Sequence, residues 1–184
     1  MRIIAGTAGS IPIEVPKSLT RPTTDRVREA VFSSLSRRVA EAAVLDLFAG
    51  SGSLGLEALS RGARSAVFVD SSATACAAIS KNLEKTGLSG GRVVKADAVS
   101  FLSGRDLGSF DLVFADPPYA RDDATLADLS ALLENPRLAA AVSTDGLLVL
   151  ESSARAPVPE APLWKVEKER IYGKTRVSFL APTS

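Results

Sequence analysis

The chain has 184 residues, with one cysteine, no histidine and a formal net charge of +1. This length fits a single domain with a full hydrophobic core, and the lone Cys76 cannot form an internal disulfide. The lack of histidine excludes Ser-His triads and imidazole catalysis, and we expect no metal site. Carboxylates must therefore carry the polar chemistry.

We expect a cytoplasmic protein without a membrane anchor. No apolar run approaches the roughly 20 residues that span a bilayer. The apolar stretch at residues 1–6 is too short for the core of a signal peptide.

The positive charge is concentrated in residues 1–40, which hold seven lysines and arginines against three acidic residues, a net charge of +4. The remaining 144 residues therefore carry −3. A basic segment on a slightly acidic body is typical of local contact with a polyanion. A solvated helix face is the alternative interpretation.

Two short strands, at residues 2–5 and 11–15, flank a glycine-containing turn and predict an amino-terminal hairpin. Thr23 or Thr24 is then expected to cap a helix over residues 25–40. Its predicted inward stripe consists of Val27, Ala30, Val31 and Leu35. Four arginines are expected to lie largely off that stripe: Arg26, Arg28, Arg37 and Arg38.

From residue 44 the sequence alternates between short apolar runs and helical segments. Strands are expected at 44–48, 66–70, 92–96, 110–115 and 147–151, and helices at 53–60 and 73–86. This alternation predicts parallel strands covered on both faces. Residues 165–170 and 175–181 flank a turn at Gly173 and predict a closing antiparallel hairpin.

These elements predict an α/β fold of the class I methyltransferase type, Rossmann-like, with a mostly parallel seven-stranded sheet. A dinucleotide-binding sheet usually lacks the closing hairpin. We expect one domain over residues 1–184, with a hairpin and basic helix at 1–40 and the catalytic core at 41–184.

Gly50, Gly52 and Gly55 have the spacing Gly-x-Gly-x-x-Gly between the first strand and the first helix of the core. Gly50 and Gly52 permit close approach of the backbone to a ligand, which suits S-adenosylmethionine or a dinucleotide. Asp70, at the end of the second strand, suits a ribose diol in either class.

Three further carboxylates favour S-adenosylmethionine. Asp46 would bind the cationic methionine amine, directly or through water, but would repel a pyrophosphate. Asp97 would accept a hydrogen bond from the adenine amine, and Asp116 follows the next strand. Singly, each fits a cap or turn, but four aspartates at successive strand ends predict a lined site. The predicted cofactor contacts are Asp46, Phe48, Gly50, Ser51, Gly52, Asp70, Ser71, Asp97, Ala98 and Asp116.

The tetrapeptide Asp116-Pro117-Pro118-Tyr119 predicts the catalytic site, which would hold a planar amine. The lone pair of a nucleobase amine is delocalised, so an enzyme must orient its nitrogen. Asp116 and the Pro117 carbonyl would accept its two N–H bonds, while Tyr119 would stack on the extruded base. Pro117 and Pro118 stiffen the loop and remove two backbone donors. A plain strand-ending turn is the alternative.

Three segments together resemble the bacterial 16S ribosomal RNA guanine-N2 methyltransferases of the small-subunit type. Residues 21–32 (RPTTDRVREAVF) are similar to that family's amino-terminal signature, and residues 46–58 (DLFAGSGSLGLEA) to its cofactor loop. Residues 116–119 complete the set. The loop and tetrapeptide are shared with other amino-methyltransferases, whereas residues 21–32 narrow the family.

The resemblance implies S-adenosylmethionine as methyl donor and a guanine amine of 16S ribosomal RNA, in an assembled or partly assembled small subunit, as acceptor. It makes Arg21, Arg26 and Arg28 the expected RNA contacts, in a protein that we expect to be monomeric. The chain departs from the family in its uncharged hairpin turn at residues 6–10, where arginines are usual, and in Asp70, which is commonly glutamate.

Several rival functions share part of this pattern. A DNA adenine or cytosine amino-methyltransferase uses the same pocket but normally needs a further segment to read base sequence. A protein glutamine methyltransferase generally has asparagine in place of Asp116. An NAD-dependent oxidoreductase fits the glycine spacing but lacks a hydride-transfer site, and a non-catalytic RNA-binding module would not need the complete set of site residues.

Overall fold

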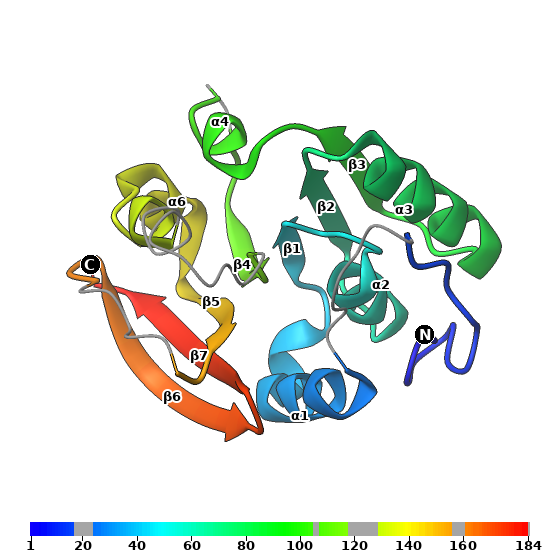
Figure 1. Ribbon diagram of the computed structural model, residues 1–184, viewed down its shortest axis with the longest axis horizontal. Coiled ribbons are helices and arrows are strands. Elements are labelled where there is room, and N and C mark those ends of the chain that lie inside the picture. Colours follow the sequence, from blue (N-terminus) through cyan, green and yellow to red (C-terminus); the bar gives the residue numbers. More distant parts are fainter. Residues whose placement is uncertain (17–23, 105–106, 118–128, 156–160, 184) are drawn as a thin grey trace.

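The computed structural model describes residues 1–16, 24–104, 107–117, 129–155 and 161–183. Its centre is a seven-stranded sheet in the order β3-β2-β1-β4-β5-β7-β6 (Figure 1). The strands are β1 Ala43–Leu47, β2 Ser65–Asp70, β3 Gly91–Lys95, β4 Phe110–Ala115, β5 Val142–Ser153, β6 Trp164–Tyr172 and β7 Thr175–Pro182. Strands β1 to β5 pair in parallel, and β7 runs antiparallel to both β5 and β6. The predicted parallel sheet with a closing hairpin is confirmed.

The helices are α1 Asp25–Leu35, α2 Ser53–Ser60, α3 Ala73–Thr86, α4 Ala98–Leu102 and α6 Pro136–Ala141, and residues 129–133 are also helical. The predicted boundaries of α2 and α3 are confirmed. The predicted helix over residues 25–40 was too long, because α1 ends at Leu35 and continues as the 3-10 helix Ser36–Val39. Ser36 has a φ of 48°, which an α-helix cannot accommodate. Thr24 caps α1 by accepting the Val27 N–H.

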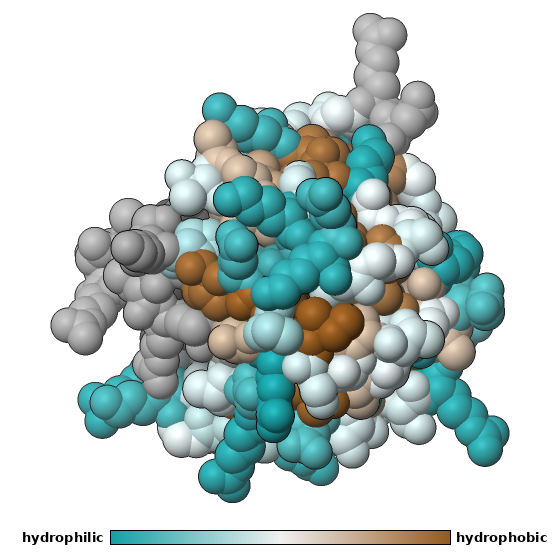
Figure 2. Space-filling model, turned by 90° about the vertical axis from the view of Figure 1, so that its right-hand side faces the viewer, coloured by the Kyte–Doolittle hydropathy of each residue, from teal (hydrophilic) through white to brown (hydrophobic). Residues whose placement is uncertain are grey.

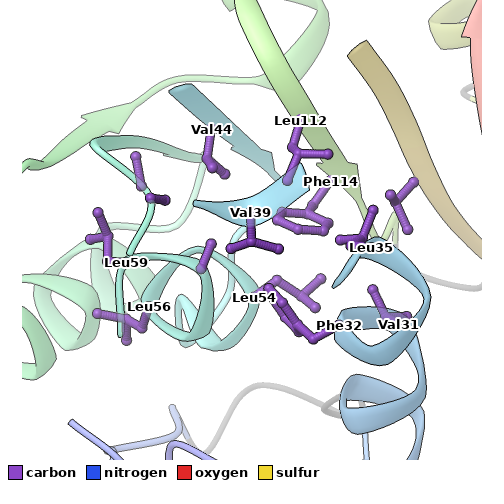
Figure 3. Close-up of a cluster of buried hydrophobic side chains, with 14 of the residues drawn as sticks. Val31, Phe32, Leu35, Val39, Val44, Leu54, Leu56, Leu59, Leu112 and Phe114 are labelled. Carbon is purple, nitrogen blue, oxygen red and sulfur yellow. The ribbon is translucent and has the colours of Figure 1, made fainter. Parts of the chain in front are cut away.

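Alternating residues of the central strands face two hydrophobic layers. Val44 and Phe114 pack with residues from α1, α2 and α3, whereas Leu45 and Val113 pack with α4 and α6. In the first layer the rings of Phe32 and Phe114 lie 5.7 Å apart at 48° (Figure 3). This contact joins α1 to the centre of the sheet.

Residues 1–16, hereafter the N-terminal segment, form the predicted hairpin with one antiparallel bridge between Arg2 and Pro12 instead of two strands. The Ile3 and Ser10 amides donate to the Ile11 and Ile3 carbonyls at 3.0 and 2.9 Å. The hairpin lies beside α2 and α3, at the right of Figure 1. The surface on this side is mixed, with hydrophilic residues gathered near its centre and hydrophobic patches beside them (Figure 2).

Across the described residues, none of the helices combines the length and apolar character needed to cross a bilayer.

Candidate active site

The chain makes a tight turn between β1 and α2. Phe48, Gly50 and Gly52 have φ values of 58°, 56° and 76°. Such values favour glycine, so Phe48 holds an unfavourable backbone conformation at the point where the strand ends. The Gly50 N–H donates to Asp70 Oδ2 at 2.8 Å, and the Gly52 N–H donates to the Ala49 carbonyl at 2.6 Å. These two bonds help to fix the path of the turn at residues 48–52, hereafter the glycine turn.

Two of the three glycines permit close packing within the protein. A Cβ at Gly55 would lie 2.3 Å from Cε1 of Phe68, and one at Gly52 would lie 3.1 Å from Cγ1 of Ile79. Helix α2 therefore approaches β2 and α3 more closely than a side chain at either position would allow. The predicted approach of a ligand to Gly50 and Gly52 stays a prediction.

Asp46 lies beneath the turn, with only 2% of its surface exposed, and its Oδ2 accepts the Gly55 N–H at 2.9 Å. Burial raises the pKa of this carboxyl from its ordinary 3.8 to about 8, and the charge of Asp70 adds to the rise, whereas the Gly55 hydrogen bond opposes it. A buried carboxylate of this kind needs a cation beside it to remain ionised. The environment thus fits the ammonium group of a methionine moiety.

Asp70 connects two turns at the ends of β1 and β2. While Oδ2 accepts from Gly50, Oδ1 accepts the Ser72 N–H at 2.8 Å. The side chain is half-buried, and Ser71 beside it is exposed. Asp70 therefore stands at the rim of the sheet, where the predicted ribose contact requires it, in an orientation fixed by both turns.

Asp97 caps helix α4, because its Oδ1 accepts the Ser100 N–H at 2.9 Å. The residue is exposed, and Ala98 behind it is buried. Asp97 is therefore a helix cap, which was the alternative role for this aspartate. A carboxylate has a second oxygen that can accept a hydrogen bond, so the adenine contact stays a prediction.

Asp116 and Pro117 follow β4, where the first is half-buried and the second buried. Leu47 pairs with Ala115 in the β1–β4 register, so Phe48 and Asp116 leave neighbouring strands at the same level. The sheet order reverses between these two strands, which is where open α/β sheets bind their ligands. Pro118 and Tyr119 lie outside the described residues.

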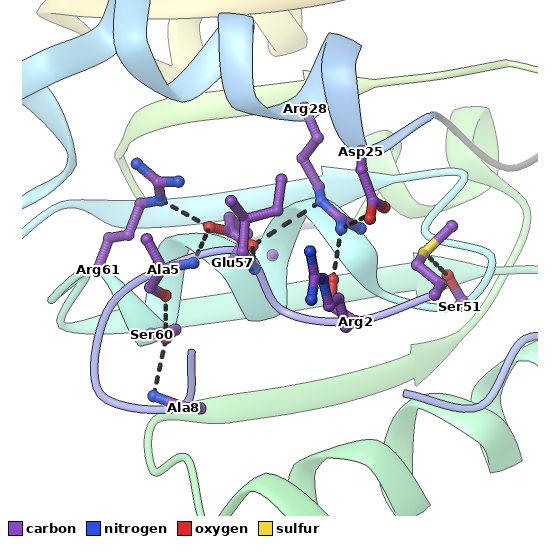
Figure 4. A network of polar contacts seen from close by, with 12 residues as sticks. Arg2, Ala5, Ala8, Asp25, Arg28, Ser51, Glu57, Ser60 and Arg61 are labelled. Atoms are coloured by element: carbon purple, nitrogen blue, oxygen red, sulfur yellow. Dashed lines mark hydrogen bonds and ion pairs between the residues drawn. The ribbon is translucent and has the colours of Figure 1, made fainter. Parts of the chain in front are cut away.

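Arg28 does not form the predicted RNA contact. Its side chain is fully buried, within 3.0 Å of Asp25 Oδ1 and 3.8 Å of Glu57 Oε2, and it also donates to the Arg2 carbonyl (Figure 4). The prediction was wrong because this guanidinium pairs inside the protein. Arg26 is exposed, as predicted, and Arg21 lies outside the described residues.

Glu57 at the centre of this network was not predicted. It has no exposed surface and accepts the Ile4 and Ala5 amides at 2.7 and 3.1 Å, as well as Arg61 Nε at 2.7 Å (Figure 4). All eight residues of α2 are buried. Glu57 is the one acidic residue in this short, largely apolar helix. That pattern could have predicted a buried carboxylate with an arginine as its partner.

The strand order, the closing hairpin and the glycine turn next to a row of strand-end carboxylates define a class I S-adenosylmethionine-dependent methyltransferase. The predicted fold class is therefore confirmed. S-adenosylmethionine is the methyl donor of this class, as predicted. Asp46, Asp70 and the Gly50 turn are the described groups that fit it.

Comparison with known proteins supports this class and identifies the family within it. The family model described as Conserved hypothetical protein 95 matches residues 1–181. Ribosomal RNA small subunit methyltransferase D of Escherichia coli K12 is 37% identical over 176 residues, which cover 95% of this chain and 86% of that protein. The protein of the same name from Haemophilus influenzae is 35% identical over 178 residues, with 94% and 89% covered. The chain therefore belongs to the family of the ribosomal RNA small subunit methyltransferases D, and the predicted resemblance is confirmed.

Solved structures show the same fold. An Escherichia coli protein described as a proposed methyltransferase superposes with a TM-score of 0.84 at 34% identity, over 99% of this chain and 97% of its own. A more distant proposed methyltransferase, complexed with SAH, has a TM-score of 0.69 at 18% identity and matches 84% of this chain and 48% of its own.

Proposed function

We propose that the protein transfers a methyl group from S-adenosylmethionine to the exocyclic N2 amine of a guanine in 16S ribosomal RNA, within a small-subunit particle. The observation that carries this proposal is the position of Asp116, which leaves β4 level with Phe48 of the glycine turn. An acceptor held by Asp116 and a donor held by that turn would share one rim of the sheet.

The acceptor is held by the loop after β4. The Asp116 carboxylate and the Pro117 carbonyl accept the two N–H bonds of the amine, which aligns its nitrogen with the methyl group. Reaction requires these atoms to lie about 3–3.5 Å apart, and most of the catalysis is this alignment. Tyr119 stacks on the extruded base and offsets part of the cost of unstacking, since such stacking contributes about 1–3 kcal/mol.

The proton leaves late in the reaction. The amine becomes acidic as the new N–C bond forms, so no strong base is needed, and Asp116 or water accepts the proton. The donor supplies an electrophilic methyl group on a sulfonium. Asp46 binds its ammonium group, Asp70 its ribose diol and Asp97 its adenine amine.

Ribosomal RNA is favoured over DNA as the substrate by the names of the relatives and by the basic residues 1–40. Arg26 is the exposed arginine of α1 that we expect to meet phosphate. An amino-methyltransferase acting on DNA adenine or cytosine remains the alternative, because its acceptor pocket needs the same aspartate and carbonyl.

Mass spectrometry of small-subunit RNA, from cells with and without the gene, tests the proposal. We expect one N2-methylguanosine to disappear without the gene and to return when the gene is supplied. In parallel, tritiated methyl transfer should label small-subunit particles but not DNA or protein. A methyl group lost from another base, or label entering DNA instead, would contradict the assignment.

A further inference from the structure

Ser51, the middle residue of the glycine turn, is tied to the N-terminal segment. The residue was predicted as a cofactor contact, and only 4% of its surface is exposed. Its Oγ donates to Met1 Sδ at 3.8 Å (Figure 4), and its carbonyl accepts from Asn82 Nδ2 at 3.0 Å. The turn is thus supported by contacts from within the protein.

Asn82 of α3 forms the main part of this support. It is fully buried, and its Oδ1 accepts the Glu14 N–H at 2.7 Å. Its Nδ2 donates to the Glu14 carbonyl at 2.9 Å and to the Ser51 carbonyl at 3.0 Å. One carboxamide therefore satisfies both backbone groups of Glu14 and one carbonyl of the turn, using both of its N–H bonds.

These contacts fix one peptide plane. The unit between Ser51 and Gly52 is held at its carbonyl by Asn82 and at its N–H by Ala49, whose carbonyl lies 2.6 Å away. Gly52 has a φ of 76°, and glycine gives such a unit much rotational freedom in the absence of a partner. Asn82 therefore supplies one of the three contacts that orient the turn, together with the hydrogen bonds of the Gly50 and Gly52 amides.

We propose that Asn82 is a positioning residue for cofactor binding, through which the glycine turn and the N-terminal segment are coupled. The inference rests on the proposed function of the turn as the cofactor site. Coupling between two sites is reciprocal. A cofactor that stabilises the turn must therefore also stabilise the Asn82 contact with Glu14, and loosening that contact must weaken cofactor binding.

The substitution Asn82→Asp tests the first half of this coupling. It keeps an acceptor for the Glu14 N–H but removes both donors and places a carboxylate against two carbonyls. Because the Ser51 carbonyl loses its donor and faces a carboxylate instead, we expect the Kd for S-adenosylhomocysteine to rise about tenfold by calorimetry. The KM for the methyl donor should rise more than kcat falls.

Thr86→Val is the matched control. Thr86 Oγ1 donates to the Asn82 and Leu83 carbonyls within α3, so this change perturbs the same helix without removing a contact to the turn. It should leave the Kd unchanged. Equal losses in the two variants would mean that Asn82 acts only through the stability of α3, and would overturn the proposal.

Hydrogen exchange of the unaltered protein tests the second half and needs no variant. S-adenosylhomocysteine should slow exchange of the Glu14 amide more than that of Ser10, which is bonded within the hairpin. If the ligand binds but Glu14 is unaffected, the coupling is refuted and the cofactor site stands. If the ligand does not bind, the proposed cofactor site itself fails. Should Asn82→Asp not fold, this exchange measurement on the unaltered protein decides the matter.

Discussion

The guanidinium of Arg28 and the carboxylate of Glu57 face one another inside the protein, with 3.8 Å between Nε and Oε2 and no solvent exposure of either side chain. The pair joins α1 to α2, the helix that follows the glycine turn. Glu57 also accepts two amides of the N-terminal segment. A predicted RNA contact is thus a structural link between the basic helix and the cofactor side of the fold.

Arg28→Ala should strongly destabilise the protein, because it leaves Glu57 with less compensation for its burial. Breaking a buried ion pair in this way costs roughly 3–5 kcal/mol in the free energy of unfolding. Arg26→Ala, two positions earlier on α1 and exposed, should change the free energy of unfolding by less than about 0.5 kcal/mol. Urea unfolding of both variants measures the difference, and similar losses would show that the pair contributes little.

Arg26→Gln should weaken RNA binding without affecting stability. Each phosphate contact contributes roughly 0.7 to the slope of log K against log salt on single-stranded RNA, and the slope should become shallower by about that amount. Arg64→Gln is the control, because Arg64 is exposed but paired with Asp111 at 3.1 Å, at the amino end of the strands. Binding titrations over a salt series compare the two. An unchanged slope for Arg26→Gln would support a merely solvated helix face.

Asp46→Asn should make stability less dependent on pH. The folded-state pKa is raised to about 8, above its ordinary 3.8. Protonation therefore favours the folded state, and this contribution is present below about pH 4 and lost as the pH rises through 8. The asparagine variant should gain in melting temperature over the unaltered protein as the pH goes from 5 to 8.5. Asp145→Asn, at an exposed position, serves as the control. The same dependence of melting temperature on pH in all three proteins would contradict the prediction.

Cofactor affinity should rise with pH for the same reason. Below about pH 8 the amine of the methionine moiety remains cationic, whereas Asp46 must lose its proton to pair with it. We therefore expect the Kd for S-adenosylhomocysteine to fall between pH 6 and 7.5. Binding should release a proton from Asp46 to the buffer, and the number released should be less than one near pH 7.5. In Asp46→Asn the affinity should be lower and flat over this range. Calorimetry in two buffers of different ionisation enthalpy measures both quantities.

Asp116→Ala should abolish methyl transfer while largely sparing cofactor binding, because the carboxylate orients the acceptor amine. Single-turnover assays on small-subunit particles, together with calorimetry of donor binding, separate the two effects. Near-normal turnover in this variant would exclude the role proposed for Asp116.

The elements that sequence reasoning located well carry strong local signals. Helix α3 begins after the Ser72 cap and ends at Thr86, followed by Gly87 with a φ of 66°, so the sequence carries a signal at both ends. Helices α4 and α6 have five and six residues, too few for a periodic pattern, and were not predicted. The four aspartates were found because each lies at or just after the carboxyl end of a predicted strand.

The pairing of the buried polar groups could not be predicted from the sequence, because their partners are distant in sequence. Arg28 looked like a surface residue on a basic helix, and its burial depends on Glu57, which comes 29 positions later. Asn82 had no local feature to mark it, since its role comes from Glu14 and Ser51 meeting at one helix. Asp97 shows a further difficulty, as the same residue type caps helices and binds ligands.

The docking of the hairpin also constrains how the chain can fold during its own synthesis. Its hydrogen bonds to Glu57, Ser60 and Asn82 span 52 to 68 positions. Residues 1–16 cannot complete these contacts until α3 has also left the exit tunnel. Only then can the amino terminus close over the core and brace the turn.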